Sequence, residues 1–310
     1  MKIYLNRQPK LGPWGGGVKT INVLSKSLIE RGHTVSYDLD SSVDVIFCLD
    51  PRPNDKGVWY QHFLDHRSTY GTKIIQRVGD IGTHSKPELT ELVRQTIPLS
   101  DHVTYISDWA RKTIEVNNQN ESVIYLAPLS KFYNNRNKSY QIGEQLKIVT
   151  HHWSDNPKKG GSFYKKIDEF LGDRTDGDFE FAFIGRINEE LRPRSWRYIE
   201  PQNSDAISEI LPTFDAYLTA SIEEAGGNHA VEALACGLPV IYHAQGGGVT
   251  DFCKQKGIKY HDFDSFLTAV EEMRRQYADI KKNVLEYSRT LEETCHEYIN
   301  IIESSSNKHI

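Results

Sequence analysis

Residues 217–240 have the sequence YLTASIEEAGGNHAVEALACGLPV, in which a strand, a glycine turn and a helix follow one another closely. The apolar run Ala216–Thr219 predicts a buried strand. Paired glycines then precede a helix that we expect to begin near Asn228 and to end at Gly237, a residue suited to the end of a helix. A new apolar run begins at Pro239. This order of strand, helix and strand is typical of a parallel α/β sheet.

The start of the predicted helix favours an anion. The first turn of a helix has backbone N–H groups without intrahelical partners and a partial positive charge. Gly226 and Gly227 allow a phosphate to approach closely, and Asn228, His229 and Ala230 supply N–H donors. The alternative is an ordinary βαβ unit whose acidic residues simply favour a helix start.

Two carboxylates flank this turn. Glu224 precedes the helix and Glu232 lies about one turn into it, so both can point to one side of the same site. Carboxylates accept hydrogen bonds from sugar hydroxyls well. On these local features, a site for a phosphate and sugar hydroxyls and an ordinary βαβ unit with an acidic helix start explain the segment equally well.

The same alternation of strands and helices extends over the whole chain. Strands are predicted at 2–6, 34–37, 43–48, 73–78, 102–106, 122–126, 146–151, 180–184, 216–219 and 239–242, and helices include 19–31, 87–95 and 108–116. The polar segment 131–145 indicates a linker. The prediction is an α/β fold of two doubly wound domains, 1–143 and 144–290, with a C-terminal helix at 291–310 that crosses back to the first domain.

The composition excludes several other classes of protein. The chain has 310 residues, 25% of them charged, and a net charge of −5, which gives no basic field for nucleic acid. The four cysteines are widely spaced, as expected for reduced thiols in the cytoplasm. Since no apolar run approaches the roughly 20 residues of a membrane span, we expect at most peripheral contact with a membrane.

A family resemblance follows from these residues. Glu224, Glu232 and the segment ALACGLPV at 233–240 resemble the donor-site signature of retaining glycosyltransferases of family 4, the glycosyl transferases group 1. The resemblance implies the GT-B fold, with two Rossmann-like domains facing a central cleft, an N-terminal acceptor domain and a C-terminal donor domain. It also implies that Glu224 contacts the transferred sugar and that Glu232 holds the ribose.

A glycine loop before the first helix is similar to a loop of the same family. Residues 11–17 have the sequence LGPWGGG, and Gly16 and Gly17 are the predicted donor-binding residues. Glycines at the start of a helix suit close contact with a pyrophosphate. The loop lacks the Gly-x-Gly-x-x-Gly pattern of dinucleotide-binding proteins. The alternative is a turn that requires a positive φ angle.

Cations for the diphosphate are expected after the first strand of the second domain. The family has an Arg, a short loop and then Lys-Gly, and Lys159 with Gly160 match that pattern. Trp153 stands where the Arg is expected, so Lys158 or Arg186 is the alternative source of charge. A solvated helix start is the alternative interpretation of the lysines.

Asp80 and His84 are the candidates for contact with the acceptor. Family members have a polar residue near this place, and a carboxylate or imidazole can orient an acceptor hydroxyl or partly remove its proton. The alternative is a capped turn before the helix that begins near Pro87. His62 and His66 are more simply structural.

We predict no metal and no cofactor. Adjacent residues of a strand, such as His151 and His152, point to opposite faces and do not easily chelate one ion. Asp176-Gly177-Asp178 has the Asp-x-Asp form of metal-dependent glycosyltransferases, but its neighbours favour a surface turn.

The functional prediction is a retaining hexosyltransferase of class EC 2.4 in polysaccharide biosynthesis. Its donor is a UDP- or GDP-linked sugar, and its acceptor is a hydroxyl of a glycan or of a lipid-linked molecule. The alternatives are a nucleotide-sugar epimerase on the same fold and a nucleotide-sugar-binding protein without catalysis.

Overall fold

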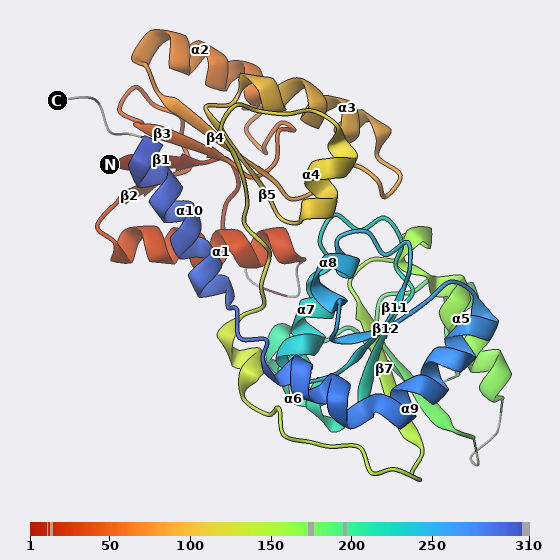
Figure 1. Ribbon diagram of the computed structural model, residues 1–310. Coiled ribbons are helices and arrows are strands. Elements are labelled where there is room, and N and C mark those ends of the chain that lie inside the picture. Colours follow the sequence, from red (N-terminus) through yellow and green to blue (C-terminus); the bar gives the residue numbers. More distant parts are fainter. Residues whose placement is uncertain (11, 13–14, 173–176, 195–196, 306–310) are drawn as a thin grey trace. The chain divides into compact units, whose positions relative to one another are not determined.

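The chain folds into two compact units (Figure 1). The structure is a computed structural model, and it describes residues 1–10, 12, 15–172, 177–194 and 197–305. Unit 1 comprises 1–126 and the segment from Thr290 onward, and unit 2 comprises 127–289. The division therefore falls after Leu126, whereas the sequence analysis placed it at 143–144.

Unit 1 is built on a parallel sheet that has six strands in its described part, in the order β2-β1-β3-β4-β5-β6. Its strands are β1 (Lys2–Leu5), β2 (Thr34–Ser36), β3 (Val45–Cys48), β4 (Lys73–Val78), β5 (His102–Tyr105) and β6 (Glu121–Val123), and its helices are α1 (Gly16–Glu30), α2 (Tyr60–Tyr70), α3 (Pro87–Thr96), α4 (Asp108–Ile114) and α10 (Leu291–Ser305).

The helices of unit 1 cover both faces of its sheet, with α2 and α3 on one face and α1 and α10 on the other (Figure 1). Because alternate residues of a strand point to opposite faces, each face of the sheet forms a core with the helices that cover it. Tyr4 of β1 packs edge-on against Phe63 of α2, and Phe47 of β3 packs edge-on against Tyr298 of α10. The C-terminal helix is thus part of the core of unit 1.

Unit 2 is built on a second parallel sheet, whose six strands among the described residues have the order β12-β11-β10-β7-β8-β9. Its strands are β7 (Leu146–His152), β8 (Phe179–Gly185), β9 (Tyr198–Ile199), β10 (Ala216–Thr219), β11 (Val240–His243) and β12 (Gly257–Tyr260), and its helices are α5 (Gly161–Leu171), α6 (Ser204–Ile210), α7 (Asn228–Ala235), α8 (Val249–Cys253) and α9 (Phe263–Leu285). In chain order this is the Rossmann arrangement 3-2-1-4-5-6.

The polar segment that the sequence analysis interpreted as a linker packs against unit 2. Phe132 is fully buried, and the guanidinium of Arg136 donates to the carbonyl oxygens of Val284 and Tyr287, both at 2.9 Å. Lys138 forms an ion pair with Asp215 at 3.0 Å. These contacts explain why unit 2 begins at Ala127 and not after the polar segment.

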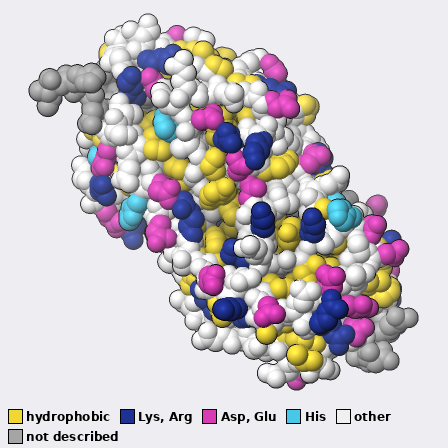
Figure 2. All heavy atoms as spheres, in the orientation of Figure 1, with side chains coloured by type: hydrophobic (Ala, Val, Ile, Leu, Met, Phe, Trp, Pro, Cys, Tyr) yellow, Lys and Arg dark blue, Asp and Glu magenta, His cyan; other side chains and the backbone are white. Residues whose placement is uncertain are grey.

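The surface of the molecule has no strong bias in charge on the face that Figure 2 shows, where basic and acidic side chains alternate. This agrees with the small net charge of −5. Among the described residues, no helix has the length and apolar character that crossing a membrane requires.

Candidate donor site in unit 2

The strand order of unit 2 identifies one edge of its sheet as a binding edge. The chain proceeds from β7 toward β8 on one side and from β10 toward β11 on the other, so β7 and β10 flank a topological switch point. Ligands of open α/β sheets bind outside the carboxyl ends of the strands at such a point. The loops that follow β7 and β10 are therefore the first place to look for a site.

These two loops touch through their backbones. Ile222 donates its N–H to the carbonyl oxygen of Lys158 at 2.9 Å. Gly160 has φ of +85°, and a Cβ atom there would lie 2.4 Å from the Cβ of Ala220. Glycine is required at position 160 by conformation and by space, because a side chain would force the loops apart.

Two ion pairs lie across the same contact. Lys158 pairs with Glu223, and Lys159 pairs with Glu224. The second pair is the more buried, since its side chains are 19% and 10% exposed against 31% and 45% in the first. The structure thus brings together Lys159 and Glu224, two residues that the sequence analysis assigned to the donor separately.

The glycine turn leads into α7 as predicted. Gly227 is the residue before the helix and has φ of +93°, and Asn228 and His229 are the first residues of α7. The N–H of Ala230 donates to the carbonyl oxygen of Gly227 at 3.0 Å. That amide bonds within the first turn of the helix, and the assignment of the first N–H groups of α7 to a bound phosphate stays a prediction.

Glu232 lies deeper, on the buried side of α7. Its Oε2 atom is 2.9 Å from Nε2 of His151, and the two side chains are 3% and 2% exposed. Sequence reasoning considered His151 only as a metal ligand and missed this pair. The available signal was the position of His151 at the carboxyl end of a strand beside the predicted site.

His152, the next residue of β7, bonds to helix α5. Its Nε2 atom lies 2.7 Å from the hydroxyl of Tyr164 on α5. Burial lowers the pKa of His152 well below its usual 6.5, and the ammonium of Lys159 is among the neighbouring groups that lower it further. The imidazole of His152 is therefore neutral near pH 7, and it acts as a hydrogen-bonding part of the core.

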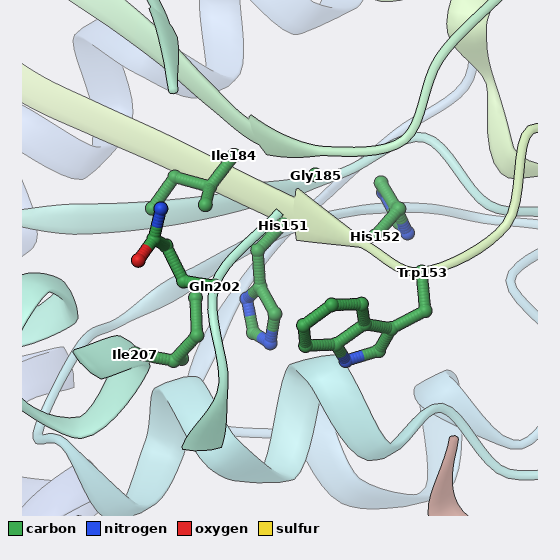
Figure 3. A pocket seen from close by; sticks show the side chains of 7 residues that line it. All are labelled: His151, His152, Trp153, Ile184, Gly185, Gln202 and Ile207. Carbon is green, nitrogen blue, oxygen red and sulfur yellow. The ribbon is translucent and has the colours of Figure 1, made fainter. Parts of the chain in front are cut away.

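A small hollow opens beside these residues (Figure 3). Its lining comes from the ends of β7 and β8 and from the start of α6, and consists of His151, His152, Trp153, Ile184, Gly185, Gln202 and Ile207. In Figure 3 the indole of Trp153 lies next to the imidazole of His151.

Arg186 follows β8 at the edge of this hollow. Its N–H donates to the carbonyl oxygen of His152 at 3.0 Å, and its side chain is exposed. Gly185 has φ of +125°, and a Cβ there would lie 1.9 Å from the carbonyl oxygen of His152. The backbone of Arg186 therefore lies beside the end of β7, next to the residue that precedes Trp153.

The predicted glycine loop belongs to unit 1, where β1 and β3 flank the switch point of the sheet. Leu11, Pro13 and Trp14 lie outside the described residues. Gly16 and Gly17 are the first two residues of α1. Neither has a positive φ, and no described atom lies within 4 Å of a Cβ placed at Gly17. The fold of the described chain therefore does not require glycine at position 17.

Asp80 also belongs to unit 1 and closes the loop after β4. Its carboxylate accepts from the N–H of Gly82 at 2.9 Å and pairs with Lys86 at 2.8 Å. These are the contacts of the capped turn that was the alternative interpretation. His84 lies in the same loop and is partly buried. A role of either residue toward an acceptor stays a prediction.

Among the described residues, no group of three or more His, Cys, Asp or Glu side chains is arranged to hold a metal ion. Asp176 lies outside the described residues, and Asp178 forms an ion pair with Arg274.

Comparison with known families and structures adds to this geometry. Residues 170–286 match the model of the family described as Glycosyl transferases group 1. Over this part of unit 2, the resemblance to the glycosyl transferases group 1 that was inferred from the sequence is confirmed. The match supports glycosyl transfer. A comparison with curated protein sequences found no match.

Solved structures show the same fold over nearly the whole chain. Sucrose-phosphate synthase from Thermosynechococcus elongatus has a TM-score of 0.69 at 12% identity, with 98% of each chain covered. WaaG, a glycosyltransferase involved in lipopolysaccharide biosynthesis, has a TM-score of 0.66 at 16% identity, with 97% of this chain and 99% of that chain covered. HepE from Anabaena, in complex with UDP and glucose, has a TM-score of 0.68 at 14% identity, with 98% and 99% covered.

These likenesses confirm the predicted fold class, a GT-B protein of two Rossmann-like units.

Proposed function

We propose that this protein is a retaining glycosyltransferase that moves a hexosyl group from a UDP- or GDP-linked sugar to a hydroxyl of a glycan or a lipid-linked acceptor. The observation that carries the proposal is the convergence of Lys159, Glu224 and the start of α7 at the switch point of unit 2. A cation and a helix N-terminus suit a diphosphate, and a carboxylate suits sugar hydroxyls. The relative HepE was solved with UDP and glucose, which supports a nucleotide sugar as ligand.

The chemistry assigns a role to each group. The bond between the anomeric carbon and the diphosphate oxygen breaks, a bond to the acceptor oxygen forms, and the acceptor hydroxyl loses its proton. Negative charge grows on the leaving diphosphate, where Lys159 and the first N–H groups of α7 stabilise it. Glu224 holds hydroxyls of the transferred sugar, and Glu232 holds the ribose.

Residues of unit 1 also have proposed roles. The backbone at Gly16 and Gly17 approaches the diphosphate, and the lack of any structural need for glycine at 17 supports a ligand as the reason for it. Asp80 or His84 orients the acceptor hydroxyl.

Trp153 favours a second candidate function, the binding of a nucleotide sugar without transfer. It stands where the family pattern has an Arg, and its indole Nε1 is buried without a hydrogen-bond partner among the described residues. An indole cannot supply the positive charge that an Arg gives to the leaving diphosphate.

The two candidates are separated by measuring thermal shift and release of nucleoside diphosphate with a set of UDP- and GDP-sugars. For a transferase, one donor raises the melting temperature and slowly releases its nucleoside diphosphate, and Glu224→Gln abolishes the release. The matched control is Glu223→Gln, which alters the neighbouring and more exposed pair and retains both effects. A donor that binds but releases nothing, with or without added glycan acceptors, supports binding alone. No stabilisation by any nucleotide sugar contradicts both.

A further inference from the structure

His151 and Glu232 are buried partners that come from distant parts of the chain, one at the carboxyl end of β7 and the other on α7. The distance from Nε2 to Oε2 is 2.9 Å. A buried carboxylate needs hydrogen-bond donors, because loss of water penalises its charge. An ionised carboxylate only accepts, so Nε2 of His151 carries the proton and donates it.

The other nitrogen of the same ring has no such partner. Nδ1 of His151 is buried and makes no hydrogen bond within the described chain. The same is true of the hydroxyl of Ser221, which follows β10. Buried polar atoms in native proteins are almost always paired, so an unpaired one indicates a place for a ligand or a water molecule. In the tautomer with its proton on Nε2, Nδ1 is an acceptor.

The pair lies at the edge where the diphosphate is expected. The imidazole of His151 is 6.4 Å, between ring centroids, from that of His229 in the first turn of α7. It also lines the hollow next to Trp153 (Figure 3). A group bound here would therefore be a near neighbour of a diphosphate at the start of α7. It must donate hydrogen bonds, since a carboxylate and an unprotonated nitrogen both accept. The vicinal hydroxyls of a ribose meet this requirement.

We propose that His151 is a positioning residue for the ribose of the donor: it fixes the Glu232 carboxylate through Nε2 so that the carboxylate meets the ribose hydroxyls in one orientation. The proposal rests on the proposed function and adds to it a residue that the donor signature lacks. His151 acts through Glu232 and does not take part in the transfer itself. The effect belongs to binding, so it appears in the KM for the donor more than in kcat.

The test is isothermal titration with UDP and with 2′,3′-dideoxy-UDP, repeated with GDP and its dideoxy counterpart. For the wild type, removal of the hydroxyls weakens binding about tenfold or more, as expected for hydrogen bonds to a charged group. His151→Leu weakens binding of the ribonucleotide by a similar factor and leaves binding of the dideoxynucleotide nearly unchanged. His151→Gln, whose amide N–H replaces Nε2, restores most of the lost affinity.

The matched control is His243→Leu at the carboxyl end of β11, where the imidazole bonds to the carbonyl oxygen of His261. It should leave both affinities unchanged. The positioning role is overturned if His151→Leu weakens both nucleotides equally, which indicates general damage, or weakens neither. In those outcomes wild-type binding still supports the proposed function. A wild type that binds neither UDP nor GDP overturns both proposals.

Discussion

A Cβ atom placed on Gly227 would lie 2.5 Å from Cγ2 of Val249, so the turn before α7 is packed against the start of α8. The φ angle of +93° at Gly227 is unfavourable for any residue with a side chain. Position 227 is therefore restricted to glycine twice, by its conformation and by its neighbour.

Gly227→Ala should lower the free energy of unfolding by about 1–3 kcal/mol, because strain in φ and a steric clash add. It should also weaken nucleoside diphosphate binding, since the start of α7 must shift. Gly32→Ala is the control, because Gly32 has φ of +88° with no described atom within 4 Å of the added Cβ. Chemical denaturation of both variants separates the cost of the strained φ angle, which both share, from the cost of the clash with Val249, which only Gly227→Ala has. Equal losses of stability would show that the contact with Val249 contributes nothing.

Lys159 and Lys158 are adjacent and carry the same charge, yet we expect only the first to matter for the diphosphate. Lys159→Ala should weaken UDP binding by about tenfold or more, as for loss of a charge-assisted hydrogen bond. Lys158→Ala should change it little, because the pair with Glu223 is the more exposed of the two. Titration of both variants with UDP, side by side with the wild type, checks this. If Lys158→Ala weakened UDP binding more than Lys159→Ala did, Lys158 would be the cation that binds the diphosphate.

Gly17→Ala should weaken nucleotide binding without lowering the stability of the protein. Glycine within a helix costs up to about 1 kcal/mol relative to alanine, and a Cβ at Gly17 meets no described atom, so the variant should be as stable as the wild type or more stable. If the backbone of α1 approaches the diphosphate, the same methyl group should weaken binding of UDP or GDP. Thermal unfolding with and without nucleotide gives both results from one experiment. Unchanged nucleotide affinity would remove Gly17 from the donor site.

The stability of the protein should fall as the pH drops below 6.5, and His152 should account for part of this fall. The pKa of His152 is lowered by burial and by nearby positive charges, so the folded state resists protonation while the unfolded chain binds a proton near pH 6.5. The unfolded state therefore gains relative stability as the pH falls. Urea unfolding between pH 7.5 and 5.5 measures the slope.

His152→Gln keeps a polar group near Tyr164 and does not titrate, so its slope should be shallower than that of the wild type. Burial also lowers the pKa values of His102 and His243, so some dependence on pH remains in the variant. Identical slopes for the two proteins would contradict the role given to His152.

The sequence predicted the elements that have a strong apolar pattern. The predicted strand 73–78 has the bounds of β4, and the run Ala216–Thr219 has those of β10. The prediction did not name α2, which buries Tyr60, Phe63 and His66, and whose apolar pattern is interrupted by a polar histidine on its inner face. It also missed β9, which has two residues and depends on pairing with β8.

The parts of the candidate site that depend on neighbouring residues in the sequence could be predicted. The turn at Gly227 and the start of α7 follow from neighbouring residues. The pair of His151 and Glu232 does not, because it joins residues 81 positions apart through the packing of α7 against the end of β7. The role of Asp80 in its own loop was one of two interpretations, and only the hydrogen bond to Gly82 shows which contact the folded chain makes.

The path of the chain through its two units has a consequence for biosynthesis. Unit 2 is continuous in sequence, whereas unit 1 is completed only by α10, whose Cys295 and Tyr298 are buried against α1 and the sheet. Domains generally fold as they leave the ribosome, in order from the N-terminus. Here the order is inverted, since all of unit 2 emerges before the last helix of unit 1. In residues 1–126, the face of the sheet that α10 covers therefore stays exposed until α10 has been synthesised and has left the ribosome.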